Sequence, residues 1–181
     1  MIVLMAGLPG CGKSTLAEAL AARLSGIVLD KDKIRAALFG PTGIEYSTEQ
    51  DDFCQELMLE TAAWLFSKNP AQTIFLDGRP FSRRYQIEQI IEAAQALGQR
   101  WHILECICSA ETARKRLEQL ESAEKHPAAN RSYALFLKVK ETFEEIRLPK
   151  TVIDTQQPLE SCVELAIHAI SLAAAADGSH H

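Results

Sequence analysis

Short apolar runs alternate along the chain with longer segments in which apolar residues recur every three or four positions. The runs predict strands at residues 2–6, 26–30, 73–77, 101–107 and 151–153. The segments between them predict helices near residues 13–24, 31–39, 48–68, 82–97, 109–121, 131–146 and 158–175. Strands that alternate with helices usually form a parallel sheet covered on both faces. The pattern therefore predicts an α/β fold with a five-stranded parallel sheet and helices on both faces.

Two irregular stretches interrupt this alternation. Residues 122–132 are polar, contain Pro127 and join two predicted helices, which favours a small lid. Residues 39–47 lie where an acceptor-binding loop could form. Either stretch could also be an ordinary connector. Since no repeat or long Gly/Ser linker is present, residues 1–177 are expected to form one domain, and residues 178–181, GSHH, are typical of a tag remnant.

Composition and charge narrow the classes of function. The 181 residues are 47% hydrophobic and carry a formal net charge of −5, so a full core is expected and a non-specific nucleic-acid binder is mildly disfavoured. The five cysteines show no repeated spacing and are expected to be reduced thiols. No leader peptide is expected, because residues 1–6 run directly into a glycine-rich loop and leave no room for a charged n-region. No membrane span is expected, because the longest apolar stretch, residues 165–176, is too short to cross a bilayer. A cytoplasmic location is predicted.

Residues 7–14, GLPGCGKS, match the phosphate-binding pattern G-x-x-x-x-G-K-[ST]. The match is specific because a predicted strand precedes it and a predicted helix follows it. Gly7, Gly10 and Gly12 allow the backbone to wrap so that N–H groups face a phosphate, and the helix N-terminus adds a favourable partial charge. The motif predicts binding of ATP with Mg²⁺.

Other positions of this loop have individual expected roles. Lys13 is expected to bridge the β- and γ-phosphates, Ser14 to give its hydroxyl to Mg²⁺, and Thr15 to contact the α-phosphate. Cys11 fits two hypotheses, an apolar side chain that fills space or a thiol whose alkylation blocks ATP binding. Both remain open.

Two further patches follow the second and third predicted strands. Asp32 and Arg35 are three residues apart at a helix start and share one face, which is explained either by an N-cap beside a solvated arginine or by a ligand site. Their place beyond a strand's carboxyl end favours the ligand site. Asp77 ends the third strand as a Walker B carboxylate does, where it would hold a water of the Mg²⁺ shell. Arg79 and Arg83 are candidates for binding acceptor phosphate, although Arg83 could simply be solvated.

A family resemblance rests on these motifs together. GLPGCGKST, the D-x-x-R spacing and the Asp77 patch resemble the polynucleotide-kinase and zeta-toxin-like branch of P-loop kinases, small AAA-type ATPase-like kinases. The run DKDKIR is also similar to adenylylsulfate and gluconate kinases. The resemblance implies a P-loop NTPase fold with a small helical lid. It implies that Asp32 accepts the proton of the attacking hydroxyl and that Arg35 orients the acceptor.

The lid departs from the pattern of this branch. Related sequences often carry R-L-x-x-R, whereas the stretch from Arg116 reads RLEQL and lacks the second arginine. Arg131 or Lys125 could supply the missing charge to the transferring phosphoryl group.

The nucleobase contacts are assigned by analogy. Arg114 or Arg116 could stack on adenine, and residues 154–158, with Thr155 and Pro158, would wrap the base. Solvated charges on an amphipathic helix would also explain the two arginines.

Three classes of function follow. The first is a phosphotransferase that moves the γ-phosphoryl group of ATP to a hydroxyl of a small molecule or a nucleic-acid 5′ end. The second is a regulatory ATPase without an acceptor, and the third is a nucleotide-binding module without catalysis. The placement of Asp32 argues against the second, and intact Lys13, Ser14 and Asp77 argue against the third.

Several residues are not expected to act in a site. His102, His126 and His168 lack the spacing of metal ligands. Trp64 and Trp101 fall on apolar faces and are expected in the core.

Overall fold

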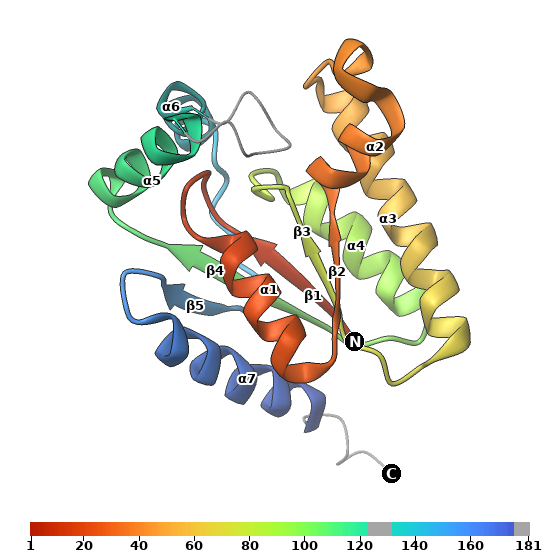
Figure 1. Ribbon diagram of the computed structural model, residues 1–181. Helices are drawn as coiled ribbons and strands as arrows, with labels where there is room; N and C mark the ends of the chain where they lie inside the picture. The colour runs from red at the N-terminus through yellow and green to blue at the C-terminus, as the bar shows by residue number, and fades with distance from the viewer. Residues whose placement is uncertain (123–131, 176–181) are drawn as a thin grey trace.

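The computed structural model describes residues 1–122 and 132–175 (Figure 1). The strands of this part are β1 (Ile2–Ala6), β2 (Ile27–Asp30), β3 (Ile74–Asp77), β4 (Trp101–Ile107) and β5 (Thr151–Asp154). The helices are α1 (Lys13–Leu24), α2 (Lys31–Gly43), α3 (Thr48–Lys68), α4 (Arg84–Ala96), α5 (Ala110–Ser122), α6 (Tyr133–Glu141) and α7 (Leu159–Ala175). All strand pairs are parallel, in the order β2-β3-β1-β4-β5. The predicted α/β fold is confirmed.

The central strand β1 shows why the sheet is covered on both faces. Its side chains alternate, so Ile2 and Leu4 pack in one apolar core with α3 and α4, whereas Val3 and Met5 pack in a second core with α1 and α7. Every residue of β1 is buried. A strand buried on both faces has no polar alternation, which explains its continuous apolar sequence.

The remaining helices lie near the carboxyl ends of the strands. In Figure 1, α5 and α6 lie on one side of these ends and α2 lies on the other. Ala113 and Leu117 of α5 pack against Phe136 of α6 in a small third apolar cluster. Loops and helix N-termini therefore meet at one end of the sheet, where open α/β sheets bind ligands.

Two predicted helix boundaries were wrong. The helix expected at 131–146 is Tyr133–Glu141. Beyond it the Glu144 N–H donates to the Ser82 carbonyl oxygen at 2.9 Å, and Ile146 is buried in the core beside α4. These tertiary contacts override the helical pattern.

α2 extends beyond the predicted end at residue 39. It reaches Gly43, but the chain is kinked at Gly40, where φ is 60° and ψ is −178°, and Pro41 follows. The kink needs a residue that tolerates positive φ, and glycine does so without strain. The irregular stretch expected at 39–47 is thus partly helical.

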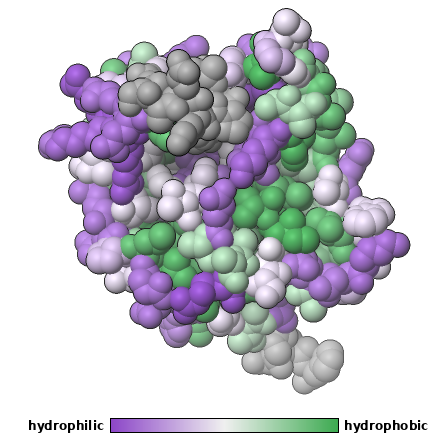
Figure 2. Space-filling view, viewed as in Figure 1, coloured by the Kyte–Doolittle hydropathy of each residue, from purple (hydrophilic) through white to green (hydrophobic). Residues whose placement is uncertain are grey.

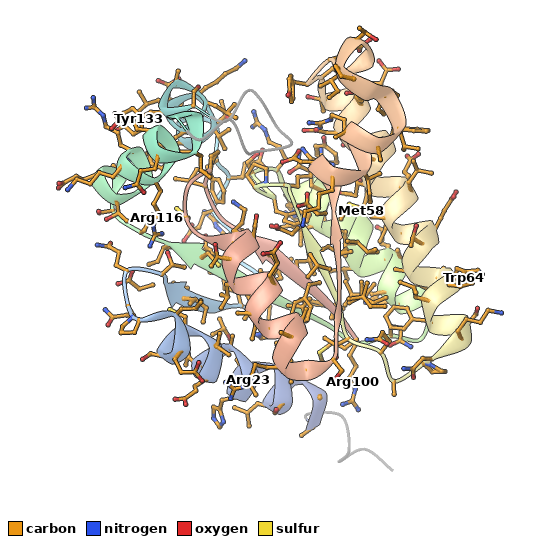
Figure 3. The ribbon with its side chains drawn as sticks, viewed as in Figure 1. Arg23, Met58, Trp64, Arg100, Arg116 and Tyr133 are labelled. Carbon is orange, nitrogen blue, oxygen red and sulfur yellow. The ribbon has the colours of Figure 1, made fainter. Side chains whose placement is uncertain are left out.

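The expectation for one tryptophan was also wrong. Trp64 is 61% exposed on α3, with the Lys68 ammonium 5.6 Å from the centre of its ring; Figure 3 labels it at the edge of the molecule. Trp101 is half-buried and packs against the core, as expected. The central part of the expected lid, residues 123–131, lies outside the described residues.

The surface is mixed in character (Figure 2). Both hydrophilic and apolar side chains are visible on the face shown. The large exposed apolar side chains of the protein include Leu38, Phe53 and Leu165. Within residues 1–122 and 132–175, no helix combines the length and apolar character needed to cross a bilayer.

Leu4→Ala should lower the free energy of unfolding by about 3–5 kcal/mol, because it leaves a cavity in a fully buried core. Leu172→Ala is the matched control: Leu172 is 58% exposed on α7, and its loss should change stability by less than about 0.5 kcal/mol. Urea unfolding curves measure both values. Equal effects of the two changes would contradict the assignment of β1 to the core.

Candidate functional site

The phosphate loop is seated tightly between the neighbours of β1. Gly7 has φ 127°, and a Cβ at this position would overlap the carbonyl oxygen of Cys106 in β4. On the other side, the Gly7 N–H donates to the carbonyl oxygen of Pro80 at 3.1 Å, in the segment that follows β3. The loop therefore approaches both neighbouring strands so closely that only glycine fits at residue 7.

The first turn of α1 faces this loop. Gly12, with φ 76° and ψ 13°, stands at the N-cap and provides no side-chain cap to the first N–H groups of α1, the kind of groups that bind anions at helix N-termini. Lys13 is buried, and its Nζ donates to the carbonyl oxygens of Gly7 at 2.8 Å and Leu8 at 2.9 Å. Its ammonium is thus held across the loop.

A cavity of about 500 Å³ opens beside the loop. Residues from the loop and α1 form one wall, and α5 and the segment after β5 form the other. The wall residues include Gly10, Gly12, Lys13, Ser14, Thr15, Arg116, Thr155, Gln157 and Leu159. The volume is typical of sites for nucleotide-sized ligands.

Arg116 joins the two walls of this large cavity. It extends from α5 (Figure 3), and its guanidinium donates to the Thr155 hydroxyl at 3.0 Å and to the Thr155 carbonyl oxygen at 2.8 Å. The Thr155 hydroxyl in turn lies 3.1 Å from the carbonyl oxygen of Cys11 and 3.2 Å from that of Ile107. Arg116 is therefore fixed to the segment after β5 and, through Thr155, to the phosphate loop.

Not every expected nucleotide contact lines the large cavity. Gly7 and Cys11 shape the loop from behind, and Pro158 is absent from the lining although Gln157 and Leu159 on either side belong to it. Sequence reasoning also missed Gln119 and Leu120, which lie three and four residues after Arg116. That spacing puts them on the same helix face as Arg116, and it could have identified them from the sequence as residues of the same site.

Asp77 ends β3 in full burial. In the described part of the chain, neither of its carboxylate oxygens receives a hydrogen bond. A buried carboxylate without donors is costly unless a cation or water satisfies it. No three His, Cys, Asp or Glu side chains of residues 1–122 and 132–175 gather as a metal site. Asp77 and Ser14 nevertheless fit Mg²⁺, which keeps most of its shell as water and phosphate oxygen.

Asp30, and not Asp32, provides the N-cap of α2. The Asp30 carboxylate accepts the backbone N–H groups of Asp32 at 2.8 Å and Lys33 at 3.3 Å and so caps α2. Burial, and then the nearby charges of Asp77 and Asp32, raise the pKa of Asp30. The side chain of Asp32 is therefore not used as the cap.

Asp32 instead belongs to a buried group of charges between α2 and α3. Lys31 Nζ lies 3.4 Å and Arg35 Nη1 lies 3.3 Å from Asp32 Oδ1. Both cations also pair with Asp51 of α3, Lys31 at 2.7 Å. The Arg35 guanidinium lies 5.3 Å from the centre of the Tyr46 ring, and Tyr46 has a strained backbone with φ 50°. Burial lowers the pKa of Lys31 to about 8.

Arg79 reaches the same region from the segment after β3. It is 2% exposed and donates to Gln55 Oε1 at 2.9 Å and to Asp52 Oδ1 at 2.5 Å. Asp51, Asp52 and Gln55 on α3 were not predicted. Their sequence showed only an acidic first helical turn, and their proximity to Arg35 and Arg79 depends on how α3 packs.

A second cavity, of about 140 Å³, lies between these groups. Its lining includes Lys13, Lys31, Asp32, Arg35, Tyr46, Asp51 and Arg79. Lys13 lines this small cavity and also the large one beside the loop. The two cavities thus meet at the lysine of the phosphate loop.

Two sequence expectations do not join this arrangement. Arg83 lies on the surface at the N-cap of α4, where it pairs with Glu144 at 3.1 Å, and it lines neither cavity. The candidate role of Arg83 in binding acceptor phosphate therefore stays a prediction that neither cavity supports. Arg131 and Lys125, the candidates for the lid charge, lie outside the described residues.

Residues 2–146 match the model of a family described as an AAA domain. No curated protein matches the chain.

Solved structures with the same fold are numerous. A gluconokinase from Sinorhizobium meliloti 1021 is 20% identical, with a TM-score of 0.70 over 99% of this chain and 97% of its own. A sugar kinase from Janibacter sp. is 19% identical, with a TM-score of 0.68 over 96% of each chain. The APS kinase of Mycobacterium tuberculosis, solved with AMPPNP and APS, is 14% identical, with a TM-score of 0.70 over 94% of this chain and 96% of its own. These likenesses establish a shared fold.

Thr155→Val should lower the free energy of unfolding by about 1–2 kcal/mol, since it removes the hydroxyl that connects Arg116, Cys11 and Ile107. Thr61→Val is the control, because the Thr61 hydroxyl is exposed and bonds only the carbonyl of its own helix at 2.7 Å. Urea midpoints measure both. A Thr155 variant as stable as the wild type would show that this hydroxyl does not hold the two walls together.

Proposed function

We propose that this chain, which belongs to the AAA domain family, is an ATP-dependent phosphotransferase acting on a hydroxyl of a small molecule. One observation carries the proposal: Lys13 lines both the large cavity beside the phosphate loop and the small cavity that contains Asp32. A kinase needs its donor and acceptor sites to meet where the phosphoryl group is transferred. A hydrolase without an acceptor has no need of the second cavity.

The large cavity is proposed as the nucleotide site. The N–H groups of the loop and of the first turn of α1 would bind phosphate oxygens, and the Lys13 ammonium would leave the loop carbonyls to reach the β- and γ-phosphates. The base would lie between Arg116 and the segment at Gln157, beside Leu159. Ser14 and Asp77 would hold Mg²⁺, which neutralises phosphate charge when bound.

Asp32 is proposed as the general base. The hydroxyl oxygen of the acceptor attacks the γ-phosphorus, the bond to the bridging oxygen of ADP breaks, and the hydroxyl proton passes to the Asp32 carboxylate. Asp32 is suited to this role because Asp30 caps the helix in its place. Lys31 and Arg35 hold the Asp32 carboxylate at the edge of the small cavity.

The buried charges favour a functional explanation over a structural one. Lys31, Asp32 and Arg35 are buried and Asp51 is partly buried, at a desolvation cost that their mutual attraction offsets only in part. Well-packed apolar side chains would stabilise this position between α2 and α3 as well or better. Four charges around a polar cavity are therefore best explained by a ligand that they orient.

The acceptor is proposed to be a small molecule rather than a nucleic-acid 5′ end. The small cavity, about 140 Å³ in volume, suits a compact polar ligand, and its lining offers both donors and acceptors of hydrogen bonds. A long anionic polymer would need an extended basic surface, whereas the chain carries a net charge of −5. The gluconokinase and the APS kinase with the same fold give precedent for this choice.

The expected cellular location and the expected domain organisation remain part of the proposal. We place the protein in the cytoplasm because all five cysteines are free thiols, which fits a reducing compartment. We keep residues 1–177 as one functional domain, with Arg131 or Lys125 providing the lid charge.

Asp32→Asn should lower phosphoryl transfer by about two to four orders of magnitude, the usual contribution of a positioned base, while leaving ATP affinity unchanged. Glu18→Gln, on the exposed surface of α1, is the control for removal of one carboxylate. Single-turnover transfer and calorimetric ATP titration separate the two effects. Loss of ATP binding in the Asp32 variant would mean that its role is misassigned.

Screening hydroxyl metabolites and 5′-OH oligonucleotides for acceptor-dependent release of ADP tests the proposed reaction. Lys13→Ala is the blank, since it should abolish ATP turnover with every acceptor. We expect release with a small polar acceptor and none with oligonucleotides. ATP hydrolysis that no acceptor stimulates would replace the proposal with a regulatory ATPase.

A further inference from the structure

We propose that Cys11 and Cys108 form an oxidation site at which a peroxide makes an intramolecular disulfide, and that this bond lowers the affinity of the phosphate loop for nucleotide. The inference goes beyond the proposed phosphotransfer. It depends on the loop binding a nucleotide and not on what happens to the phosphoryl group.

The two sulfur atoms lie side by side although 97 residues separate them. Cys11 Sγ is 3.3 Å from Cys108 Sγ, whose thiol donates to it, and Cys108 Sγ is 3.9 Å from the carbonyl oxygen of Gly10. Cys11 belongs to the phosphate loop, and Cys108 lies between β4 and α5. A disulfide has a sulfur–sulfur length of about 2.05 Å, so little more than 1 Å of movement would join them.

The chemical environment makes this pair more reactive than the other thiols. The hydrogen bond from Cys108, assisted by the charges of Lys13 and Arg116, lowers the pKa of Cys11 to about 7 despite its burial. The same hydrogen bond raises the pKa of Cys108. One proton is thus held between two sulfurs, which leaves thiolate character on Cys11.

The remaining cysteines lack both features. Cys54, Cys106 and Cys162 are buried, and burial raises the pKa of each, that of Cys106 to about 12. Cys11 is itself only 2% exposed, but Cys108 beside it is half-buried, so a small oxidant reaches the pair from the side of Cys108. Oxidation is therefore expected to be selective for Cys11 and Cys108.

The chemistry needs one peroxide molecule for each disulfide. The Cys11 thiolate attacks one peroxide oxygen, the O–O bond breaks, and Cys11 becomes a sulfenic acid while the departing hydroxide takes a proton to form water. Cys108 then attacks the sulfenic sulfur, the S–O bond breaks, and its proton leaves with the hydroxyl as a second water. Both thiols are oxidised and the peroxide is reduced.

The disulfide would act on the loop because the loop has no room to adjust. Gly7 is already packed against Cys106, and the Cys11 carbonyl oxygen is bonded to Thr155. Closing the sulfurs draws Cys11 away from Thr155 and towards the start of α5. A displacement of about 1 Å in a site that positions phosphate groups is enough to cost a large part of its affinity.

Mass spectrometry tests the bond. After treatment of the reduced chain with hydrogen peroxide, we expect a mass decrease of two hydrogen atoms and a link between tryptic peptides 1–13 and 101–114. The second peptide also contains Cys106, so the link should persist in Cys106→Ser and Cys54→Ser and disappear in Cys108→Ser. Oxygen addition without a link, or a link that survives in Cys108→Ser, would overturn the proposal.

Titration with a fluorescent ADP analogue tests the consequence. We expect the oxidised wild type to bind at least about tenfold more weakly and to recover with dithiothreitol. Peroxide should weaken binding less in Cys108→Ser, where Cys11 can be oxidised to a sulfenic acid but not linked. A linked chain that binds as tightly as the reduced one would overturn the regulatory part. If the reduced chain fails to bind, the proposed function fails instead, while the mass measurement still decides the oxidation site.

Discussion

Gly7 brings the backbone of the phosphate loop against the carbonyl oxygen of Cys106, and no residue with a side chain fits there. This contact fixes the loop relative to β4, while the hydrogen bond to Pro80 fixes it relative to the segment after β3. The Lys13 ammonium rests on two carbonyls of the same loop. The position of Lys13, which lines both cavities, therefore depends on one close approach of backbone to backbone.

Charge is arranged differently in the two cavities. The large one offers N–H groups and Lys13, and its lining in the described part of the chain has no acidic residue, which suits a polyphosphate. The small one is lined by acids and bases that pair with each other, so it can orient a polar molecule without a large net field. Desolvation of the charges around the small cavity lowers the stability of the fold. The apolar cores on both faces of the sheet offset this loss. The apolar cores thus maintain a fold whose small charged cavity does not itself add stability.

The sequence could predict those features of the structure that depend only on residues close together in the chain. Strands buried on both faces must be apolar throughout, and the phosphate loop needs glycine and lysine at fixed spacing, so both are visible in a single segment. Asp51 and Asp52 are different, because only the packing of α3 against α2 and against the segment after β3 brings them to Arg35 and Arg79. The pairing of Cys11 with Cys108 likewise depends on the order of strands in the sheet. The end of α6 was missed because contacts made by Glu144 and Ile146 replace helical bonds.

The positions of the two tryptophans determine what their fluorescence can report. Trp101 begins β4, and the cavities lie beyond its other end, about 20 Å away at the usual rise of a strand. Trp64 lies more than three turns along α3 from Asp52, in contact with solvent. Intrinsic tryptophan fluorescence will therefore report the unfolding of the sheet and will not change when a ligand binds. Ligand binding has to be measured by calorimetry or with a labelled ligand.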